Sequence, residues 1–298
     1  MNYILTKDVV KIYRGNVVAL NEVSFSIDKL GIIGLVGPNG AGKTTLIKIL
    51  TTLTRPTRGK AEVLEYDVVN DYEKIRRRIS LVPQDASPEL YLTPYEHVYW
   101  YLRSRGLSRG DAEKLTKDVL EKLGLWDHRN KVCAKLSGGM RQRVLIASAL
   151  AVPADIYFLD EPTVGLDPLA RRDVWNVLRD VSRGSLIFLT THYMEEAEAL
   201  SDLLIMINRG RIIEIGSPKE LIRKVPYKYK IILDKKIDLI KSSFKTVDTE
   251  KEKIIYVENE NDLPDLLDYL LSQKIDFSLK TTTLEDLFIM KVRESENR

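Results

Sequence analysis

The stretch GIIGLVGPNGAGKTT, residues 31–45, decides the fold of this chain. It opens with an apolar run typical of a strand that is buried on both faces of a parallel sheet. It then matches the spacing G-x-x-x-x-G-K-[ST], in which glycines leave backbone N–H groups free to surround phosphates. The helix-forming run TTLIKIL follows directly. Strand, glycine turn and helix in this order predict a nucleoside triphosphate site.

The predicted phosphate loop supplies both a cation and a metal ligand. Lys43 is expected to reach the β- and γ-phosphates, and the Thr44 hydroxyl is expected to coordinate Mg²⁺. The loop residues that we assign to nucleotide contact are Gly37, Pro38, Asn39, Gly40, Ala41, Gly42, Lys43, Thr44 and Thr45.

Polar side chains end three more apolar runs, namely ADIYFLDEP (154–162), SLIFLTTH (185–192) and the shorter RISLVPQ (78–84). Because ligands bind beyond the carboxyl ends of parallel strands, we expect these side chains to surround the phosphates. Asp160 would serve Mg²⁺, Glu161 would hold the attacking water, and His192 would donate to the γ-phosphate. The alternatives are a strand-end acidic pair that faces solvent and a structural histidine. Gln84 ends the shorter run.

The stretch LSGGMRQR, from Leu136, predicts a second anion-binding turn. Ser137 offers a hydroxyl, Gly138 and Gly139 leave amides uncovered, and the predicted helix RQRVLIASALA starts there. The turn has no lysine of its own and lies in a helix-rich insert. Such an insert would project from the core, so we expect a second copy to present this turn to the nucleotide.

Asp167, in TVGLDPLARRDVW, admits a simple local explanation. It is a good N-cap, and Pro168 is a good first residue of a helix. Capping therefore competes with a functional role for Asp167, and both can hold.

The order of these runs predicts an α/β core from the start to about residue 223, with a helix-rich insert over residues 85–152. Residues 224–298 read as a small α+β appendage. Its expected strands are YKYKIIL, KIIYVEN and KIDFSLK, and its expected helices are IDLIKSSF, NDLPDLLDYLL and TLEDLFIMKVRE.

Composition excludes several classes of protein. The net charge of +3 over 298 residues argues against a nucleic-acid partner, and the triplet Arg76–Arg78 is read as a solvated helix face. Cys133 is the single cysteine, which excludes a disulfide framework and fits a reducing compartment. The start of the chain lacks the apolar centre of a signal peptide, and no apolar run approaches the length of a membrane helix. We therefore expect a cytoplasmic protein, which can still sit on a membrane protein.

Together, GPNGAGKTT, Gln84, LSGGMRQR, IYFLDEP, GLD (165–167) and His192 resemble an ABC transporter ATP-binding subunit. The resemblance covers the predicted core and implies a phosphate-loop NTPase fold with the ABC-specific helical insert. It also implies a head-to-tail dimer, of identical or different chains, with two ATP molecules held between phosphate loop and LSGG. The implied cofactors are ATP and Mg²⁺, and the implied partner is a separate transmembrane permease subunit.

The resemblance also assigns roles in the chain's own nucleotide site. Tyr13 would stack on adenine, while Thr44, Gln84 and Asp160 would serve the metal. The residues given catalytic roles are Glu161 as general base, His192, which would hold the γ-phosphate and the water, Lys43 and Gln84.

Across the dimer, Ser137, Gly138 and Gly139 would contact the opposite ATP, and Asp167 would contact the second copy. Met140, where many members have glutamine, resembles the multidrug and antibiotic exporters of the ABC-2 type, as does TTLEDLFIMKV near the C-terminus. The subgroup implies export of a drug-like or lipophilic substrate and a location at the inner face of the cell membrane.

Two other readings stay open from the sequence. One is a soluble, non-transport ABC ATPase of iron–sulfur assembly or ribosomes, and the other is a phosphate-loop kinase. The aromatic residues of the insert are likewise ambiguous: core packing accounts for at least half of them, and the rest would line a groove for the membrane subunit. They are Tyr91, Tyr95, Tyr99, Trp100 and Tyr101.

Overall fold

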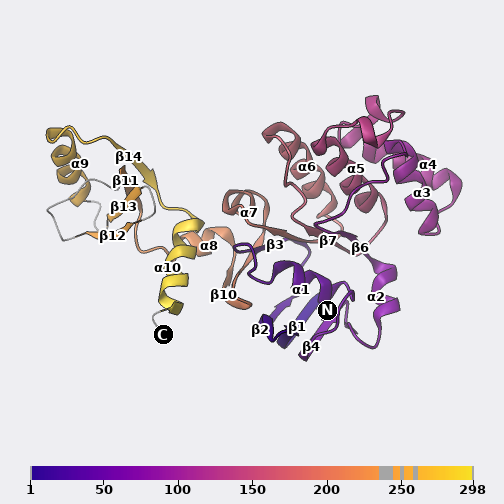
Figure 1. Cartoon of the computed structure of the whole chain (residues 1–298), viewed down its shortest axis with the longest axis horizontal. Helices are drawn as coiled ribbons and strands as arrows, with labels where there is room; N and C mark the ends of the chain where they lie inside the picture. Colours follow the sequence, from indigo (N-terminus) through magenta and orange to yellow (C-terminus); the bar gives the residue numbers. More distant parts are fainter. Residues whose placement is uncertain (1, 235–243, 249–251, 258–260, 297–298) are drawn as a thin grey trace. The chain divides into compact units, whose positions relative to one another are not determined.

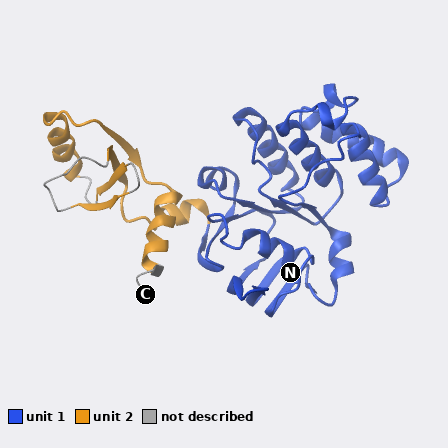
Figure 2. Cartoon of the chain, viewed as in Figure 1, with its two compact units in different colours: residues 1–216 blue, residues 217–298 orange. Residues whose placement is uncertain are grey.

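The structure is a computed structural model that describes residues 2–234, 244–248, 252–257 and 261–296. The chain divides into two compact units, Met1–Gly216 and Ser217–Arg298 (Figure 2). The first unit contains every predicted functional residue.

A six-stranded sheet with the order β10-β9-β3-β8-β7-β6 forms the centre of the first unit (Figure 1). All neighbours pair in parallel except β9 and β10, which are antiparallel. The strands are β3 (Gly31–Val36), β6 (Ile79–Val82), β7 (Ile156–Asp160), β8 (Leu186–Thr191), β9 (Leu203–Asn208) and β10 (Arg211–Gly216). The four apolar runs of the sequence are therefore four adjacent parallel strands, as predicted.

Each of these central strands faces two separate cores. Alternate side chains point to opposite faces of a strand, so Ile32 packs with the helical side and Ile33 with the other. Leu159 and Phe158 divide in the same way. Burial on both faces explains why these strands are continuous apolar runs.

A second sheet, with the order β2-β1-β4-β5, was not predicted from the sequence. Its strands are β1 (Ile4–Tyr13), β2 (Val17–Ile27), β4 (Arg58–Val63) and β5 (Tyr66–Asp67). The pairing of β1 with β2 shifts register three times, and Asp8 and Glu22 adopt positive φ. These irregularities break the alternation of polar and apolar residues that would have marked the strands. Helix α1 (Lys43–Leu50) contacts both sheets.

The segment between β6 and β7 is helical, as predicted. Its helices are α3 (Pro94–Ser104), α4 (Arg109–Lys122) and α5 (Gly138–Ala151), with short 3-10 turns at Trp126–His128 and Cys133–Lys135. The three helices contact one another, and Thr93 starts α3 with a capping box. Cys133 is fully buried in this core, which raises the pKa of its thiol and agrees with a packing role.

Helix α2 (Tyr72–Arg78) corrects one expectation for the arginine triplet. Arg76 and Arg77 are exposed, but the Arg78 guanidinium donates to both carboxylate oxygens of Asp155, at 2.9 and 3.0 Å. Arg78 therefore belongs to an ion pair that joins the start of β6 to the start of β7. The sequence did not show it because the partners lie 77 residues apart.

The second unit is a four-stranded antiparallel sheet with the order β12-β13-β11-β14. Its elements are α8 (Pro218–Ile222), β11 (Tyr229–Asp234), β12 (Lys245–Asp248), β13 (Glu252–Val257), α9 (Asp262–Ser272), β14 (Phe277–Thr281) and α10 (Leu284–Glu296). Since β11 lies between β13 and β14, the segment β13–α9–β14 is a split βαβ unit. Strand β12 was not predicted, and most of the predicted helix IDLIKSSF lies outside the described residues. Helix α8 contacts α10 and groups with this unit, ahead of the predicted boundary at residue 223.

Asp286 joins α10 to the sheet of the second unit through a buried ionic cluster. Its carboxylate, 1% exposed, accepts from Lys230 Nζ at 2.7 and 2.8 Å and from the Tyr256 hydroxyl at 2.7 Å. The Thr283 amide and hydroxyl also donate to it. Burial, together with the Asp286 carboxylate, raises the pKa of Tyr256.

We predict that Asp286→Ala destabilises the second unit by about 3–5 kcal/mol, because it leaves the Lys230 ammonium buried without its partner. Tyr256→Phe, the milder control, should cost about 1 kcal/mol for one lost hydrogen bond. The tryptophans, Trp100, Trp126 and Trp175, all lie in the first unit. Guanidinium unfolding followed by circular dichroism should therefore shift, while tryptophan fluorescence should not. Equal stability of the two variants would contradict the role given to Asp286.

Candidate functional site

A pocket of about 450 Å³ gathers most of the residues that were predicted around the phosphates, but Asp160 does not line it. It is lined by Ala19, Asn39, Gly40, Gly42, Lys43, Thr44, Thr45, Gln84, Glu161, Val164 and His192. Four strand ends contribute to it, since β3 leads to the phosphate loop, β6 to Gln84, β7 to Glu161 and β8 to His192. Ala19 and Val164 were not predicted, because neither side chain carries a chemical signal.

The phosphate loop turns from β3 into α1 at Gly42, whose φ of 108° favours glycine. A Cβ at this position would lie 2.5 Å from the Ala19 carbonyl oxygen, so the loop also needs glycine for its close approach to β2. Helix α1 begins with Lys43, and its first N–H groups face the loop. The turn therefore offers backbone donors and the positive end of a helix to an anion.

Lys43 is 5% exposed and its ammonium contacts three oxygens. It donates to the carbonyls of Gly37 at 2.9 Å and Pro38 at 3.1 Å. It also lies 3.3 Å from Glu161 Oε1. Gly37 and Pro38 thus orient the lysine rather than line the pocket, and the Ala41 side chain is buried away from it.

Glu161 joins two of the other predicted catalytic residues. Its Oε1 faces Lys43, and its Oε2 lies 3.1 Å from Nδ1 of His192. Since a carboxylate accepts, Nδ1 carries the hydrogen of this contact, and Nε2 is the other ring nitrogen available to a ligand. The backbone of Glu161 has a φ of 52°, a region that non-glycine residues seldom occupy and that clusters at functional sites.

Thr190, on β8, holds the Asp160 carboxylate at the end of β7 and the backbone amide of Glu161, and sequence reasoning missed it. Its hydroxyl donates to Asp160 Oδ1 at 2.5 Å and accepts from the Glu161 amide at 3.0 Å. Burial raises the pKa of Asp160, which is 2% exposed, while hydrogen bonds from Thr190 and Thr44 act in the opposite direction. The only local signal was the threonine pair directly before His192.

Three oxygen donors in this region fit a magnesium ion. The Thr44 hydroxyl donates to Gln84 Oε1 at 3.2 Å, and Asp160 also interacts with Thr44. Hydroxyl, amide and carboxylate oxygens are hard ligands, and Mg²⁺ commonly takes one carboxylate together with waters and phosphate oxygens. Among the described residues no group of three His, Cys, Asp or Glu side chains could hold a metal ion.

The LSGG turn lies outside this pocket. Ser137 is exposed and caps α5 by accepting from the Met140 amide at 3.2 Å, and the helix begins at Gly138, earlier than the predicted start. Neither Ser137 nor the two glycines line the pocket of the same chain. The turn is an exposed helix start on the surface of the first unit, and its binding of an anion stays a prediction.

Asp167 is the N-cap of α6 (Pro168–Val181), as predicted. Its Oδ1 accepts from the amides of Ala170 at 2.9 Å and Leu169 at 3.0 Å, and these bonds lower its pKa. Within a single chain, helix capping is sufficient to explain the position of the Asp167 side chain. Tyr13, at the end of β1, is 40% exposed and does not line the pocket, so its contact with adenine stays a prediction.

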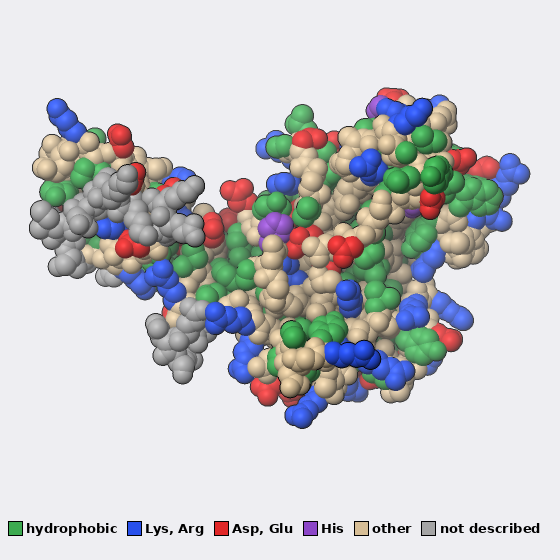
Figure 3. Space-filling model, viewed as in Figure 1, with side chains coloured by type: hydrophobic (Ala, Val, Ile, Leu, Met, Phe, Trp, Pro, Cys, Tyr) green, Lys and Arg blue, Asp and Glu red, His purple; other side chains and the backbone are tan. Residues whose placement is uncertain are grey.

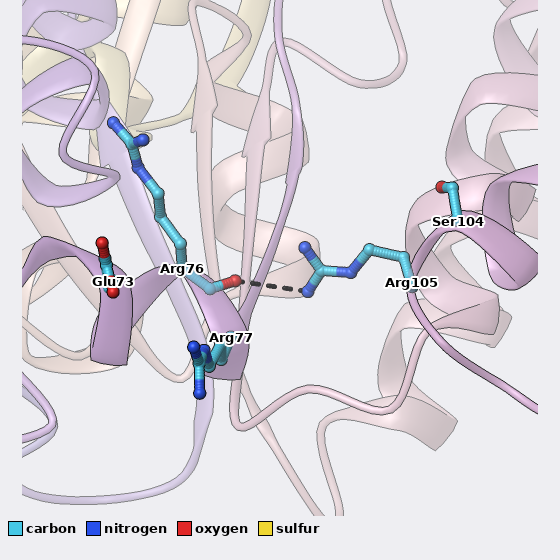
Figure 4. A pocket seen from close by; sticks show the side chains of 5 residues that line it. All are labelled: Glu73, Arg76, Arg77, Ser104 and Arg105. Atoms are coloured by element: carbon cyan, nitrogen blue, oxygen red, sulfur yellow. Dashed lines mark hydrogen bonds between the residues drawn. The ribbon is translucent and has the colours of Figure 1, made fainter.

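A second hollow, of about 570 Å³, lies between α2 and the C-terminal end of α3 (Figure 4). It is lined by Glu73, Arg76, Arg77, Ser104 and Arg105. The Arg105 guanidinium crosses it to donate to the carbonyls of Arg76 at 3.3 Å and Ile79 at 2.9 Å. Arg76 donates to the Thr52 hydroxyl and carbonyl. Both of these arginines therefore hold backbone and side-chain groups of the chain itself.

The aromatic residues of the insert divide much as the sequence suggested. Tyr95, Tyr99 and Tyr101 pack against the helical core, whereas Tyr91 and Trp100 are 87% and 57% exposed. Figure 3 shows hydrophobic side chains at the surface over α3 and α4. No helix among the described residues has the length and apolar character needed to cross a membrane.

Comparison with known proteins gives consistent matches. A family model described as ABC transporter matches residues 20–164. The doxorubicin resistance ATP-binding protein DrrA of Mycobacterium tuberculosis is 42% identical over 209 residues, which are 70% of this chain and 63% of that protein. This chain therefore spans less than two thirds of that relative.

In two further matches, this chain covers a larger share of the matched protein. The Nod factor export ATP-binding protein I of Burkholderia lata is 40% identical over 209 residues, 70% of this chain and 69% of that protein. A solved dimeric ATP-binding cassette in a post-hydrolysis state, bound to ADP and Pi, gives a TM-score of 0.66 at 27% identity, over 72% of this chain and 98% of that one.

We predict that Asp160→Asn raises the melting temperature of the chain measured without nucleotide. Because the pKa of Asp160 is raised on folding, the folded state prefers the protonated carboxyl, and stability is lost as pH rises through the folded-state pKa. The gain should therefore be larger at about pH 7 than at about pH 4. Thermal unfolding at both pH values is the measurement, and a gain that does not change with pH would contradict this account.

Proposed function

Because the chain belongs to the ABC transporter family, whose ATPase domains share its fold, we propose that it binds and hydrolyses ATP and thereby drives a separate transmembrane subunit. One observation carries the proposal. In the pocket Lys43 and His192 each contact Glu161, while the LSGG turn of the same chain lies outside it. A complete site then needs the turn of a second copy.

Within one chain, the phosphate loop would hold the triphosphate. The amides at the start of α1 face the phosphates, and the Lys43 ammonium would exchange its bond to Glu161 for phosphate oxygens. Thr44, Gln84 and Asp160 would hold Mg²⁺, which neutralises charge on the β- and γ-phosphates.

Hydrolysis would then depend on the carboxylate that Lys43 releases. Glu161 is 7% exposed and held by its strained backbone at the edge of the pocket, where it can take a proton from the attacking water. His192 contacts Glu161 through Nδ1. In this tautomer Nε2 carries no hydrogen and would accept from the attacking water, whereas a bond donated to the γ-phosphate needs a hydrogen on both ring nitrogens. Glu161 and His192 would position the water, and the Lys43 ammonium would stabilise the charge that develops on the phosphate.

The second copy would complete the site from the opposite side. Ser137 and the free N–H groups at the start of α5 form an exposed anion-binding helix end on a 14-residue helix. Two chains placed head to tail would present this end to each other's γ-phosphate, with Asp167 near the contact. The solved cassette bound to ADP and Pi is dimeric, which supports a dimer of this chain.

ATP binding would bring the two copies together, and a membrane partner would convert this movement into transport. Trp100 and Ser104 lie four residues apart on α3 and therefore on one helix face. Of the two, Ser104 lines the hollow of Figure 4. Exposed aromatics beside arginines suit a protein partner. The names of the relatives, which concern drug resistance and export, support export of a drug-like or lipophilic substrate at the inner face of the cell membrane.

The two alternative functions, a soluble ABC ATPase and a phosphate-loop kinase, explain fewer of these observations. A soluble ABC ATPase would share the pocket and the LSGG turn, but the named relatives are transport or resistance proteins. A phosphate-loop kinase gives no role to the exposed turn at Ser137. Release of phosphate from ATP without an added acceptor would exclude the kinase.

We predict that the Glu161→Gln variant forms a dimer in the presence of ATP and Mg²⁺, because it binds ATP without hydrolysing it. Adding Ser137→Arg to that variant should abolish the dimer, since the new cation and its bulk would fill the anion-binding turn. Light scattering on an eluting column gives the mass with and without ATP.

The matched control is Ser108→Arg in the same Glu161→Gln background. Ser108 caps α4 as Ser137 caps α5, accepting from an amide at 3.2 Å in both cases. Loss of a cap alone should leave the dimer intact. A Glu161→Gln chain that stays monomeric at saturating ATP would contradict the shared site.

The partner is tested with tagged Glu161→Gln and detergent-solubilised membranes of the native host. With ATP and Mg²⁺, we expect a polytopic membrane protein in near-equal amount, identified by mass spectrometry, and less of it without ATP. Recovery of ribosomal or assembly proteins from the soluble fraction instead would favour the non-transport alternative.

A further inference from the structure

Gln142, on the second turn of α5, contacts the turn that carries the proposed general base. Its Nε2 donates to the Pro162 carbonyl at 3.0 Å. Pro162 directly follows Glu161 and has no N–H, so this carbonyl is its only backbone hydrogen-bonding group. The bond therefore links the helix of the LSGG turn to the residue beside the catalytic carboxylate, 20 positions along the chain.

A second contact joins the same two segments. A Cβ at Gly139 would lie 3.3 Å from the Leu166 side chain and 3.5 Å from the Gly165 carbonyl oxygen. The first turn of α5 thus lies against residues 165–166, and Gln142 reaches back to residue 162. The start of α5 touches both ends of the turn that follows Glu161.

On its other side this turn is fixed by Glu196, on α7 (Met194–Leu200). The Glu196 carboxylate, 1% exposed, accepts from the Thr163 hydroxyl at 2.5 Å and from Trp175 Nε1 at 3.0 Å. The turn is therefore held between two anchors, Glu196 on α7 and Gln142 on α5. Of these two anchors, Gln142 lies on the helix that begins at the LSGG turn, and Glu196 does not.

We propose that Gln142 is a positioning residue that couples the two half-sites of one chain, so that nucleotide in its own phosphate loop changes the LSGG turn it offers to a second copy. The proposal rests on the proposed function. Lys43 contacts Glu161, and a phosphate that draws Lys43 away would leave the carboxylate with its His192 contact and displace the peptide after it. Gln142 passes that displacement to α5 through the Pro162 carbonyl.

Hydrogen exchange followed by mass spectrometry tests this coupling in the full chain. ATP is added without Mg²⁺, at a protein concentration where light scattering gives only monomer. In the wild type, we expect slower exchange in peptides covering the phosphate loop and a changed rate in peptides covering residues 136–143. In Gln142→Glu, which has the same size but no side-chain N–H, the first change should persist and the second should disappear.

Two variants separate coupling from a general loss of structure. Gln142→Lys restores a donor and should recover part of the response at residues 136–143. Thr163→Val removes the Glu196 anchor from the same turn, and the response should remain. Trp175→Phe, which removes one donor to Glu196, is a milder version of that control.

Steady-state ATP hydrolysis gives an independent readout. If two sites are coupled through Gln142, the Hill coefficient of the wild type should exceed 1 and fall to about 1 in Gln142→Glu. We expect kcat to fall about three- to tenfold, the effect of one hydrogen bond, with little change in the ATP affinity of the monomer.

The outcomes are distinguishable. ATP that protects the phosphate loop of the wild type but leaves residues 136–143 unchanged overturns the coupling and spares the proposed function. If Gln142→Glu keeps the wild-type exchange response at residues 136–143 and the wild-type Hill coefficient, the coupling is likewise overturned and the proposed function is spared. A chain whose phosphate loop gains no protection at any ATP concentration overturns both.

Discussion

The parallel pairing of β3, β8 and β7 is the constraint on which the site depends. Its register sets Val36 beside Thr191 and Asp160 beside Thr190, so the three strands end at nearly the same level. The phosphate loop, the carboxylates and His192 then emerge at one edge of the sheet. Burial of each strand on both faces keeps this edge rigid, and the polar residues just beyond it become the walls of the pocket.

Much of this arrangement was predictable because its signals are local in the sequence. Each central strand is a short apolar run that ends in a polar residue, and a glycine turn with Lys43 has few other uses. Asp167 was also recognisable, since N-caps are read from one or two neighbouring residues. The insert was predicted only as helix-rich, with one helix, RQRVLIASALA, placed in it.

The features that escaped prediction depend on distant or irregular partners. The sheet of β1, β2, β4 and β5 was missed because its bulges break the alternation that marks a strand. Thr190, Gln142 and Arg78 act through partners 30, 20 and 77 residues away, and no local pattern specifies such pairs. The strained backbone of Glu161 was equally invisible, because a glutamate carries no sequence signal for a positive φ.

The separation of the LSGG turn from the pocket of its own chain has a consequence for how abundance affects activity. A single copy would carry one half of each of two sites and could bind ATP without turning it over. At dilution, the rate of hydrolysis would then rise with the square of the chain's concentration. A membrane partner that binds two copies would remove this dependence on concentration. ATP would then be hydrolysed mainly where the transporter is assembled.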